Sequence, residues 1–347
     1  MSPVKGGQAA FIAEDLARVV GPLDLGRLQG STVAITGGTG FVGLWLTELL
    51  LHLSAAQKLG LKVLLLARDP AFAEREAPHL LQAPGVSLRL GDVKALHELP
   101  EDVEWVVHAA SSPDVRVHNS QPIYASQTIA QGTLNALDCA TRLPRLKGFL
   151  NISSGYVTGF HSSGDPVTEK SFEGFDPSVF SSAYMEAKRY GESLCTVYRN
   201  QYRLPIVNVR PFSFVGPYQS TDAPWAVNNF IQDAVAKRPI RIQGDGTAVR
   251  SYMYGADMAW WLLNMLLRGE PGRSYNLGSS KPVTLKELAG RIAHLTNDRV
   301  EIHHTRALLK SKPSVFVPST ELAQAELGLT LRFGLDEALL RSIQWYS

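Results

Sequence analysis

The sequence predicts an α/β fold, a doubly wound parallel sheet with a smaller, mixed C-terminal lobe. Three observations lead to this prediction. Short apolar runs alternate with helical segments over residues 31–210, a glycine-rich turn follows the first buried run, and the alternation weakens after residue 211. Strands that alternate with helices at this spacing form parallel sheets that are covered on both faces.

The expected elements follow one another in a regular order. The chain opens with a helix at 11–20, and residues 1–30 are expected to form a helical extension that packs on the body. Strands are expected at 32–36, 62–67, 86–90, 104–110, 148–153 and 205–210, and helices at 41–53, 121–142 and 181–203. Residues 31–210 are expected to form one domain. Residues 211–347 form mainly a second lobe, from which some segments return to the sheet.

Length and composition narrow the class of protein. The 347 residues suffice for a well-buried core, and the net charge of +2 indicates neither a nucleic-acid nor a membrane partner. The longest apolar run near the N-terminus contains Glu48 and His52 and is too short to span a bilayer. No secretory signal is recognisable, and Cys139 and Cys195 form no metal-ligand pattern. We therefore expect a cytoplasmic protein without a metal site.

The turn "TGGTGFVG" (36–43) lies between the first strand and the first helix. Gly37 permits the tight turn, Gly40 lets the backbone approach a pyrophosphate, and Gly43 allows the helix to pack closely on the strand. The helix N-terminus faces the anion. Because a strand–turn–helix context is what such a motif requires, the sequence predicts a Rossmann-like dinucleotide-binding domain. Thr39, Phe41 and Val42 are expected to contact the cofactor as well.

The end of the second strand, "LLLARDP", bears on the choice of dinucleotide. An acidic residue there would accept hydrogen bonds from the ribose 2′-OH of NAD. Ala67 stands where that acid is expected, and Arg68 follows with a guanidinium suited to a 2′-phosphate. The sequence therefore favours NADP(H), whereas Asp69 keeps NAD(H) possible.

Two further strand ends fit the same cofactor. Asp92 and Val93 follow the third strand, where Asp92 is expected near the adenine amino group. Ala109, Ala110 and Ser111 end the fourth strand in small residues, where bulk would block the ribose.

A hydroxyl, a phenol and an ammonium form the candidate catalytic group. Ser154 ends a central strand, and Tyr184 and Lys188 lie one helical turn apart on the next helix. We expect Tyr184 to exchange a proton with a substrate oxygen and Ser154 to hydrogen-bond that oxygen. Lys188 is expected to lower the pKa of Tyr184 and to hold the cofactor ribose. These roles suit hydride transfer between a carbonyl and an alcohol.

Together these motifs resemble the extended short-chain dehydrogenases/reductases of the nucleotide-sugar epimerase/dehydratase family, over about residues 30–345. The resemblance implies that the chain acts on a nucleotide-diphosphate sugar. Cofactor contacts are implied for Tyr184, Lys188, Pro211 and Ser213, and substrate contacts for Ser112, Ser154, Gly155, Tyr156, Asn229 and Arg250. Arg250 would pair with the pyrophosphate, since a guanidinium binds phosphate oxygens well.

Departures from the family pattern reduce the number of reactions that the chain is expected to catalyse. The family's 4,6-dehydratases carry an Asp–Glu pair where this chain has Gly155 and Tyr156. A frequent asparagine of the long helix is also replaced, since Thr128 and Ile129 occupy that place. The resemblance is strongest to 4-ketoreductases, which reduce dTDP- or CDP-linked 4-keto-6-deoxyhexoses to deoxysugars.

Several alternatives remain open at this stage. An NAD-dependent nucleotide-sugar 4-epimerase would use the same catalytic residues. A non-catalytic dinucleotide-binding protein and a reductase of a non-sugar aromatic ketone are also compatible with the sequence. The resemblance further implies a homodimer formed through the helices at 121–142 and 181–203.

Overall fold

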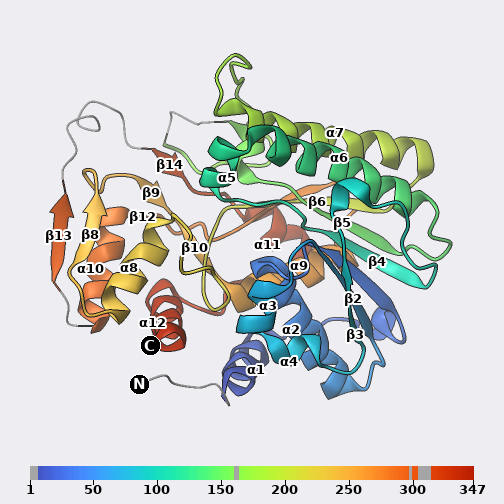
Figure 1. Cartoon of the computed structure of the whole chain (residues 1–347), viewed down its shortest axis with the longest axis horizontal. Coiled ribbons are helices and arrows are strands. Elements are labelled where there is room, and N and C mark those ends of the chain that lie inside the picture. Colours follow the sequence, from blue (N-terminus) through green and yellow to red (C-terminus); the bar gives the residue numbers. More distant parts are fainter. Residues whose placement is uncertain (1–6, 160–163, 297–298, 304–313) are drawn as a thin grey trace.

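A seven-stranded parallel sheet forms the centre of the molecule (Figure 1). The computed structural model describes residues 7–159, 164–296, 299–303 and 314–347. The strand order is β11-β6-β5-β4-β1-β2-β3. Its strands are β1 Thr32–Thr36, β2 Lys62–Ala67, β3 Val86–Leu90, β4 Val103–His108, β5 Gly148–Ile152, β6 Ile206–Pro211 and β11 Ser274–Leu277. This arrangement confirms the predicted fold class.

Helices cover both faces of this sheet (Figure 1). On one side lie α1 (Gln8–Val19), α2 (Phe41–Gln57) and α9 (Gly255–Arg268), and on the other lie α6 (Pro122–Thr141) and α7 (Ser182–Tyr202). The shorter helices are α3 Ala71–Glu76, α4 Pro78–Leu81, α5 Val115–Ser120, α8 Ala226–Val235, α10 Leu285–Thr296, α11 Glu321–Leu327 and α12 Leu335–Tyr346. The described residues also form the 3₁₀ turns η1 Gly26–Leu28, η2 Val93–Ala95 and η3 Gly155–Thr158.

The central strands β1, β4 and β5 are buried because their residues are mostly apolar on both faces, whereas the edge strand β3 is largely exposed. All of β1 is buried, and so is α9 except for its last residue. The core consists of a large cluster on the α2/α9 side and a smaller one beneath α6 and α7. Gly255 lets α9 approach α2, since a Cβ there would lie 2.2 Å from the indole nitrogen of Trp45.

The C-terminal part builds three small sheets beside the main one. They pair β10 (Tyr252–Tyr254) with β7 (Ser213–Val215), β12 (Val283–Thr284) and β14 (Val315–Phe316) with β9 (Val249–Arg250), and β13 (Val300–His303) with β8 (Ile240–Gln243). One segment of this part, β11, pairs in parallel with β6 and returns to the main sheet. The exact boundaries of the domains stay a prediction.

An ion pair connects the N-terminal helix α1 to the C-terminal helix α12. Arg341 of α12 forms an ion pair with Asp15 of α1 at 2.7 Å, and the hydroxyl of Tyr254 donates to the same carboxylate at 2.6 Å. Residues 1–6 of the expected extension lie outside the described residues.

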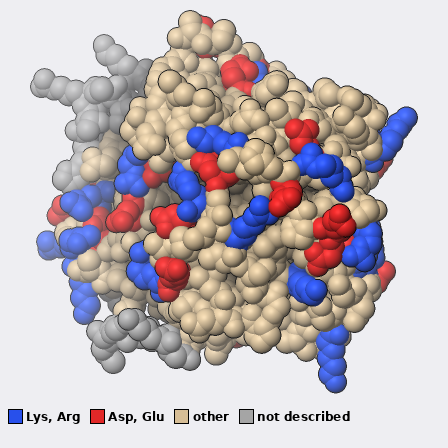
Figure 2. All heavy atoms as spheres, turned by 45° about the vertical axis from the view of Figure 1, so that its right-hand side comes forward, with Lys and Arg blue, Asp and Glu red and all other residues tan. Residues whose placement is uncertain are grey.

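Charges of both signs are interleaved on the face drawn in Figure 2, where neither sign forms a continuous field. Within the described part of the chain, no helix is both long and apolar enough to cross a bilayer.

Candidate active site

A cavity of about 1020 Å³ lies at the carboxyl ends of the central strands, where open α/β sheets bind their ligands. It brings together residues that are far apart in the sequence, from the glycine turn to the small C-terminal sheets. The predicted site residues that line it are Gly37, Thr39, Gly40, Phe41, Val42, Arg68, Asp92, Val93, Ala109, Ala110, Ser111, Ser112, Ser154, Tyr156, Tyr184, Pro211, Ser213 and Arg250.

Four predicted site residues do not line the cavity. Gly43 packs α2 onto the turn, since a Cβ there would lie 2.4 Å from the carbonyl oxygen of Gly38. Gly155 and Lys188 are buried behind the cavity wall. Asn229 is exposed on α8, so its expected substrate contact stays a prediction. The helix turns that side chain outward because the apolar residues around it fill the core.

The glycine turn has the geometry that a pyrophosphate requires. Gly37 has a φ of 68°, and a Cβ there would lie 2.8 Å from the carbonyl oxygen of Ala109. Gly40 is the N-cap of α2 and, among the described residues, no side chain caps this helix end. Its first backbone N–H groups are therefore oriented for an anion, as expected from the sequence.

Arg68 and Asp92 meet at the far end of the cavity through Tyr124, a residue that the sequence analysis missed. The Tyr124 hydroxyl donates to Asp92 at 3.0 Å and accepts from Arg68. The carboxylate of Asp69 instead accepts from the backbone N–H of Ala71 at 2.9 Å, at the start of α3. Both Arg68 and Asp69 line the cavity, but the Asp69 carboxylate is already engaged by a backbone N–H.

The structure brings the three candidate catalytic residues together. Ser154 follows β5 and Tyr184 lies in the first turn of α7, and both line the cavity. The Lys188 ammonium donates to the Ser111 hydroxyl at 2.8 Å and to the carbonyl oxygen of Ile152 at 2.9 Å. Residues of β4, β5 and α7 thus converge at one point.

The pKa of Tyr184 corrects one expectation. Burial raises this pKa to about 12, the nearby Ser154 hydroxyl opposes the rise, and Tyr156 adds to it. The prediction that Lys188 lowers the pKa is wrong here, because the ammonium is directed at Ser111 and Ile152 and burial dominates. The phenol therefore stays protonated at neutral pH.

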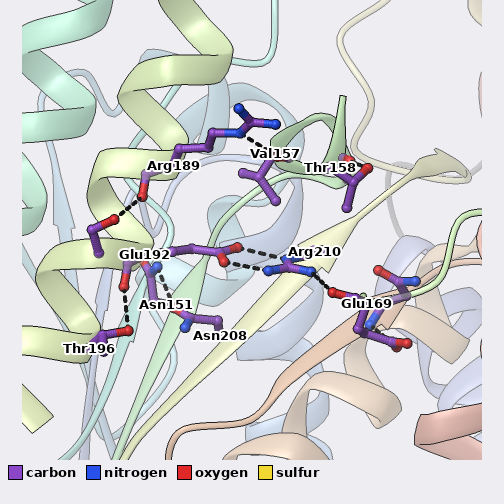
Figure 3. A network of polar contacts seen from close by, with 12 residues as sticks. Asn151, Val157, Thr158, Glu169, Arg189, Glu192, Thr196, Asn208 and Arg210 are labelled. Carbon is purple, nitrogen blue, oxygen red and sulfur yellow. Dashed lines mark hydrogen bonds and ion pairs between the residues drawn. The ribbon is translucent and has the colours of Figure 1, made fainter. Parts of the chain in front are cut away.

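Burial also lowers the pKa of Lys188 to about 8, and the negative charge of Glu192 opposes that change. Glu192 lies one helical turn after Lys188 and forms a two-pronged ion pair with buried Arg210 of β6, at 2.9 and 2.7 Å (Figure 3). Arg210 also donates to the carbonyl oxygen of Glu169 at 2.8 Å.

His118 of α5 is a second residue that the sequence analysis missed. Its ring stacks on that of Tyr184, with centroids 4.2 Å apart and planes inclined by 20°. A ring nitrogen of His118 lies 2.7 Å from the carbonyl oxygen of Ser112. Only the folded chain reveals this stack, because the two residues belong to separate helices.

Arg250 projects from β9 into the wall of the same cavity. Its Nη1 donates to the carbonyl oxygens of Val249 and Ser314, at 2.8 and 2.9 Å. These bonds fix the guanidinium at the boundary between the main sheet and the small sheets.

Residues 33–278 match the family described as "NAD dependent epimerase/dehydratase family". The chain belongs to this family. The match spans well over half of the chain and confirms the family predicted from the sequence. The family's dependence on NAD agrees with a dinucleotide site at the glycine turn, and it does not distinguish NADP(H) from NAD(H).

This epimerase/dehydratase-family chain is similar over most of its length to characterised proteins. It is 27% identical to UDP-glucuronic acid decarboxylase 2 of Arabidopsis thaliana over 324 residues, 92% of this chain and 68% of that protein. UDP-glucuronic acid 4-epimerase from Bacillus cereus, solved with UDP-glucuronic acid and NAD, has a TM-score of 0.76 at 21% identity, covering 91% and 98%. The enzyme WbmF of Bordetella bronchiseptica, solved with NAD⁺ and UDP, has a TM-score of 0.75 at 24% identity, covering 92% and 93%.

Proposed function

We propose that the protein reduces the C4 keto group of a nucleotide-linked 4-keto-6-deoxyhexose with NADPH. The observation that carries this proposal is the cluster of Ser154, Tyr184 and Lys188 at the cavity. Its phenol is protonated at neutral pH and therefore suited to donate a proton rather than to accept one.

In the proposed reaction each residue has one task. A nicotinamide cofactor held at the glycine turn would supply the hydride for C4 of the substrate. Ser154 hydrogen-bonds the C4 oxygen, and Tyr184 donates its phenolic proton to that oxygen as negative charge develops there. Lys188, fixed by Ser111 and the end of β5, would hold the cofactor ribose.

The residues after Ser154 argue against water elimination. Gly155 and Tyr156 occupy the positions at which the 4,6-dehydratases of this family carry their acid and base. Elimination across C5 and C6 needs a proton acceptor and a proton donor there. Hydride transfer at C4 needs neither, so reduction fits this chain better.

The environment of Arg68 supports NADPH as the reductant. The guanidinium lines the cavity beside Tyr124, and the Asp69 carboxylate, which also lines it, already accepts from the backbone N–H of Ala71. Replacement Arg68→Ala should therefore lower kcat/KM for NADPH by roughly 10-fold or more and leave that for NADH nearly unchanged. An equal loss with both dinucleotides would argue against a contact with the 2′-phosphate.

Arg250 is the proposed contact to the substrate diphosphate. The side chain lines the cavity and is fixed by two backbone carbonyls, so it is ordered before a ligand binds. Replacement Arg250→Ala should raise KM for a sugar nucleotide, and an unchanged KM would count against this contact.

The second candidate is an NAD-dependent nucleotide-sugar 4-epimerase. It is favoured by the similar Bacillus cereus epimerase, which was solved with NAD. The two functions differ in their use of reductant, because an epimerase regenerates its own cofactor and consumes none. A third candidate, a non-catalytic dinucleotide-binding protein, would turn over no sugar nucleotide.

The deciding experiment incubates the purified protein with dTDP-4-keto-6-deoxyglucose and NADPH. We expect loss of absorbance at the NADPH wavelength and a deoxysugar product with a C4 hydroxyl. Interconversion of C4 epimers without added reductant would instead establish the epimerase. Cofactor binding without any turnover would establish the third candidate.

The nucleotide-sugar enzyme is proposed to act as a homodimer through α6 and α7. These helices pack side by side, and Tyr190, Val197 and Tyr202 of α7 and Ile123 of α6 are each more than half exposed. Tyr190 and Val197 lie seven residues apart and therefore on one helix face. Light scattering should give the mass of two chains, and Val197→Asp should give the mass of one.

A further inference from the structure

Three aromatic rings form one wall of the cavity next to Ser154. The rings of Tyr156 and Phe316 are stacked, with centroids 4.1 Å apart and planes inclined by 10°. The ring of Phe212 lies 4.4 Å from that of Phe316, at 27°. All three line the cavity, and the side chains of Phe212 and Phe316 are only 8% and 7% exposed. We refer to Tyr156, Phe212 and Phe316 as the aromatic wall.

The aromatic wall is built directly on the backbone that carries the candidate catalytic hydroxyl. The backbone N–H of Tyr156 donates to the Ser154 hydroxyl at 3.2 Å. At Gly155, a Cβ would lie 2.7 Å from the ring of Phe212 and 2.9 Å from that of Phe316. The close packing accounts for glycine at this position, and it places the rings beside the oxygen that Ser154 is proposed to hold.

The far end of the wall connects to the proposed diphosphate contact. Phe316 belongs to β14 and pairs in register with Arg250 of β9. The small sheet thus fixes the distance between an apolar surface and a guanidinium. A ligand that carries both an apolar group and an anion matches this pair of neighbours, both of which line the cavity.

We propose that the aromatic wall binds the C5 methyl group of the substrate and thereby selects 6-deoxyhexoses over hexoses that carry a 6-hydroxyl. This inference rests on the proposed function. The group at C5 is the neighbour of the C4 carbonyl, so it lies next to Ser154 and the wall. A methyl group gains free energy when buried against rings, whereas a hydroxyl there loses its hydrogen bonds to water.

The test compares two ligands that differ only at C6. We would measure the Kd of dTDP-fucose and dTDP-galactose by calorimetry with the NADP⁺-loaded protein, and repeat the pair as UDP-sugars. The 6-deoxy ligand should bind roughly 10- to 100-fold more tightly. In Phe316→Ser, whose hydroxyl can accept the 6-hydroxyl as a partner, the two Kd values should come within about threefold.

Two further variants serve as controls. Phe316→Leu keeps the wall apolar and should keep the tighter binding of the 6-deoxy ligand. This variant therefore distinguishes the effect of an apolar surface from the general effect of a core substitution. Phe180 lines the cavity outside the aromatic wall and is 58% exposed, so Phe180→Ser should also keep the preference.

The outcomes separate this inference from the function on which it rests. Turnover of the keto sugar together with equal Kd values for both ligands would overturn the aromatic wall as a methyl subsite and leave the reductase in place. Failure to bind any sugar nucleotide, with reduction of an aromatic ketone instead, would overturn both.

Discussion

At the scale of single residues, the site depends on which protonation state each group holds. Tyr184 is buried enough that its pKa lies near 12, and Lys188 is buried enough that its pKa falls to about 8. Both values follow from desolvation of the charged form. A neutral phenol beside an ammonium is the arrangement that protonates a developing alkoxide.

The first prediction at this scale concerns the phenolic proton. Tyr184→Phe keeps the ring and its stack on His118 but removes the proton, so kcat should fall by roughly 10²- to 10⁴-fold. Steady-state kinetics of NADPH consumption measure the loss, and fluorescence titration should show that the cofactor still binds. Full activity in this variant would reject Tyr184 as the proton donor.

The second prediction concerns pH. Because the pKa of Lys188 is lowered to about 8, the ammonium is present below this pH and is lost as the pH rises through it. The kcat/KM for reduction should therefore be level at neutral pH and fall above about pH 8, which a pH series at fixed ionic strength would show. A profile that stays level to pH 10 would contradict this role.

At the scale of elements, the orientation of α7 relative to the sheet determines where Tyr184 and Lys188 lie. Glu192 of α7 and Arg210 of β6 form a buried pair, and Arg210 also holds the segment at Glu169 (Figure 3). Arg189, one residue after Lys188, donates to the carbonyl oxygen of Val157 at 2.6 Å. These contacts fix the helix that carries Tyr184 and Lys188.

The third prediction follows from this pair. Arg210→Met leaves the Glu192 carboxylate buried without its partner and should reduce the free energy of unfolding by about 3–5 kcal/mol. The double variant Arg210→Met/Glu192→Leu should regain most of that loss, because no charge is left uncompensated. Denaturant unfolding measures both, and equal losses in the single and double variants would contradict the account.

The same pair sets the charge near Lys188. Glu192→Gln removes the negative charge that raises the pKa of this lysine. The fourth prediction is that the alkaline fall of kcat/KM moves to lower pH in this variant. A merely structural role of Glu192 would lower activity at every pH without moving the profile.

At the scale of the whole molecule, buried carboxylates connect the C-terminal segment to the body. Asp257 at the start of α9 accepts from the backbone N–H groups of Arg332 and Phe333, at 2.8 and 3.0 Å. Burial raises the pKa of Asp257 to about 6 despite these bonds. At a given pH, a larger share of Asp257 is therefore protonated in the folded state than in the unfolded state.

The fifth prediction is a dependence of stability on pH. Since the pKa of Asp257 is raised from 3.8 to about 6 on folding, its contribution is fully present below about pH 4 and is lost as the pH rises through 6. Thermal unfolding should therefore show a higher Tm at pH 5 than at pH 7.5, with a smaller difference in Asp257→Asn. An identical difference in the variant would assign the effect to other groups.

The amino-acid sequence by itself determined the parallel sheet, the glycine turn and the residue types of the catalytic group. These features depend on local patterns: apolar runs, a glycine spacing, and two side chains one helical turn apart. The sequence could also exclude a carboxylate pair after Ser154, because Gly155 and Tyr156 are visible directly.

Only the tertiary structure decided which groups meet. His118 reaches Tyr184, Tyr124 joins Arg68 to Asp92, and Phe316 arrives at Ser154 from a strand more than 150 residues away. The exposed position of Asn229 could not be foreseen, because the face that a helix residue presents depends on what packs around it. The sign of the Tyr184 pKa shift was missed for a related reason, since burial is a property of the folded chain and outweighs the charge of a neighbour in the sequence.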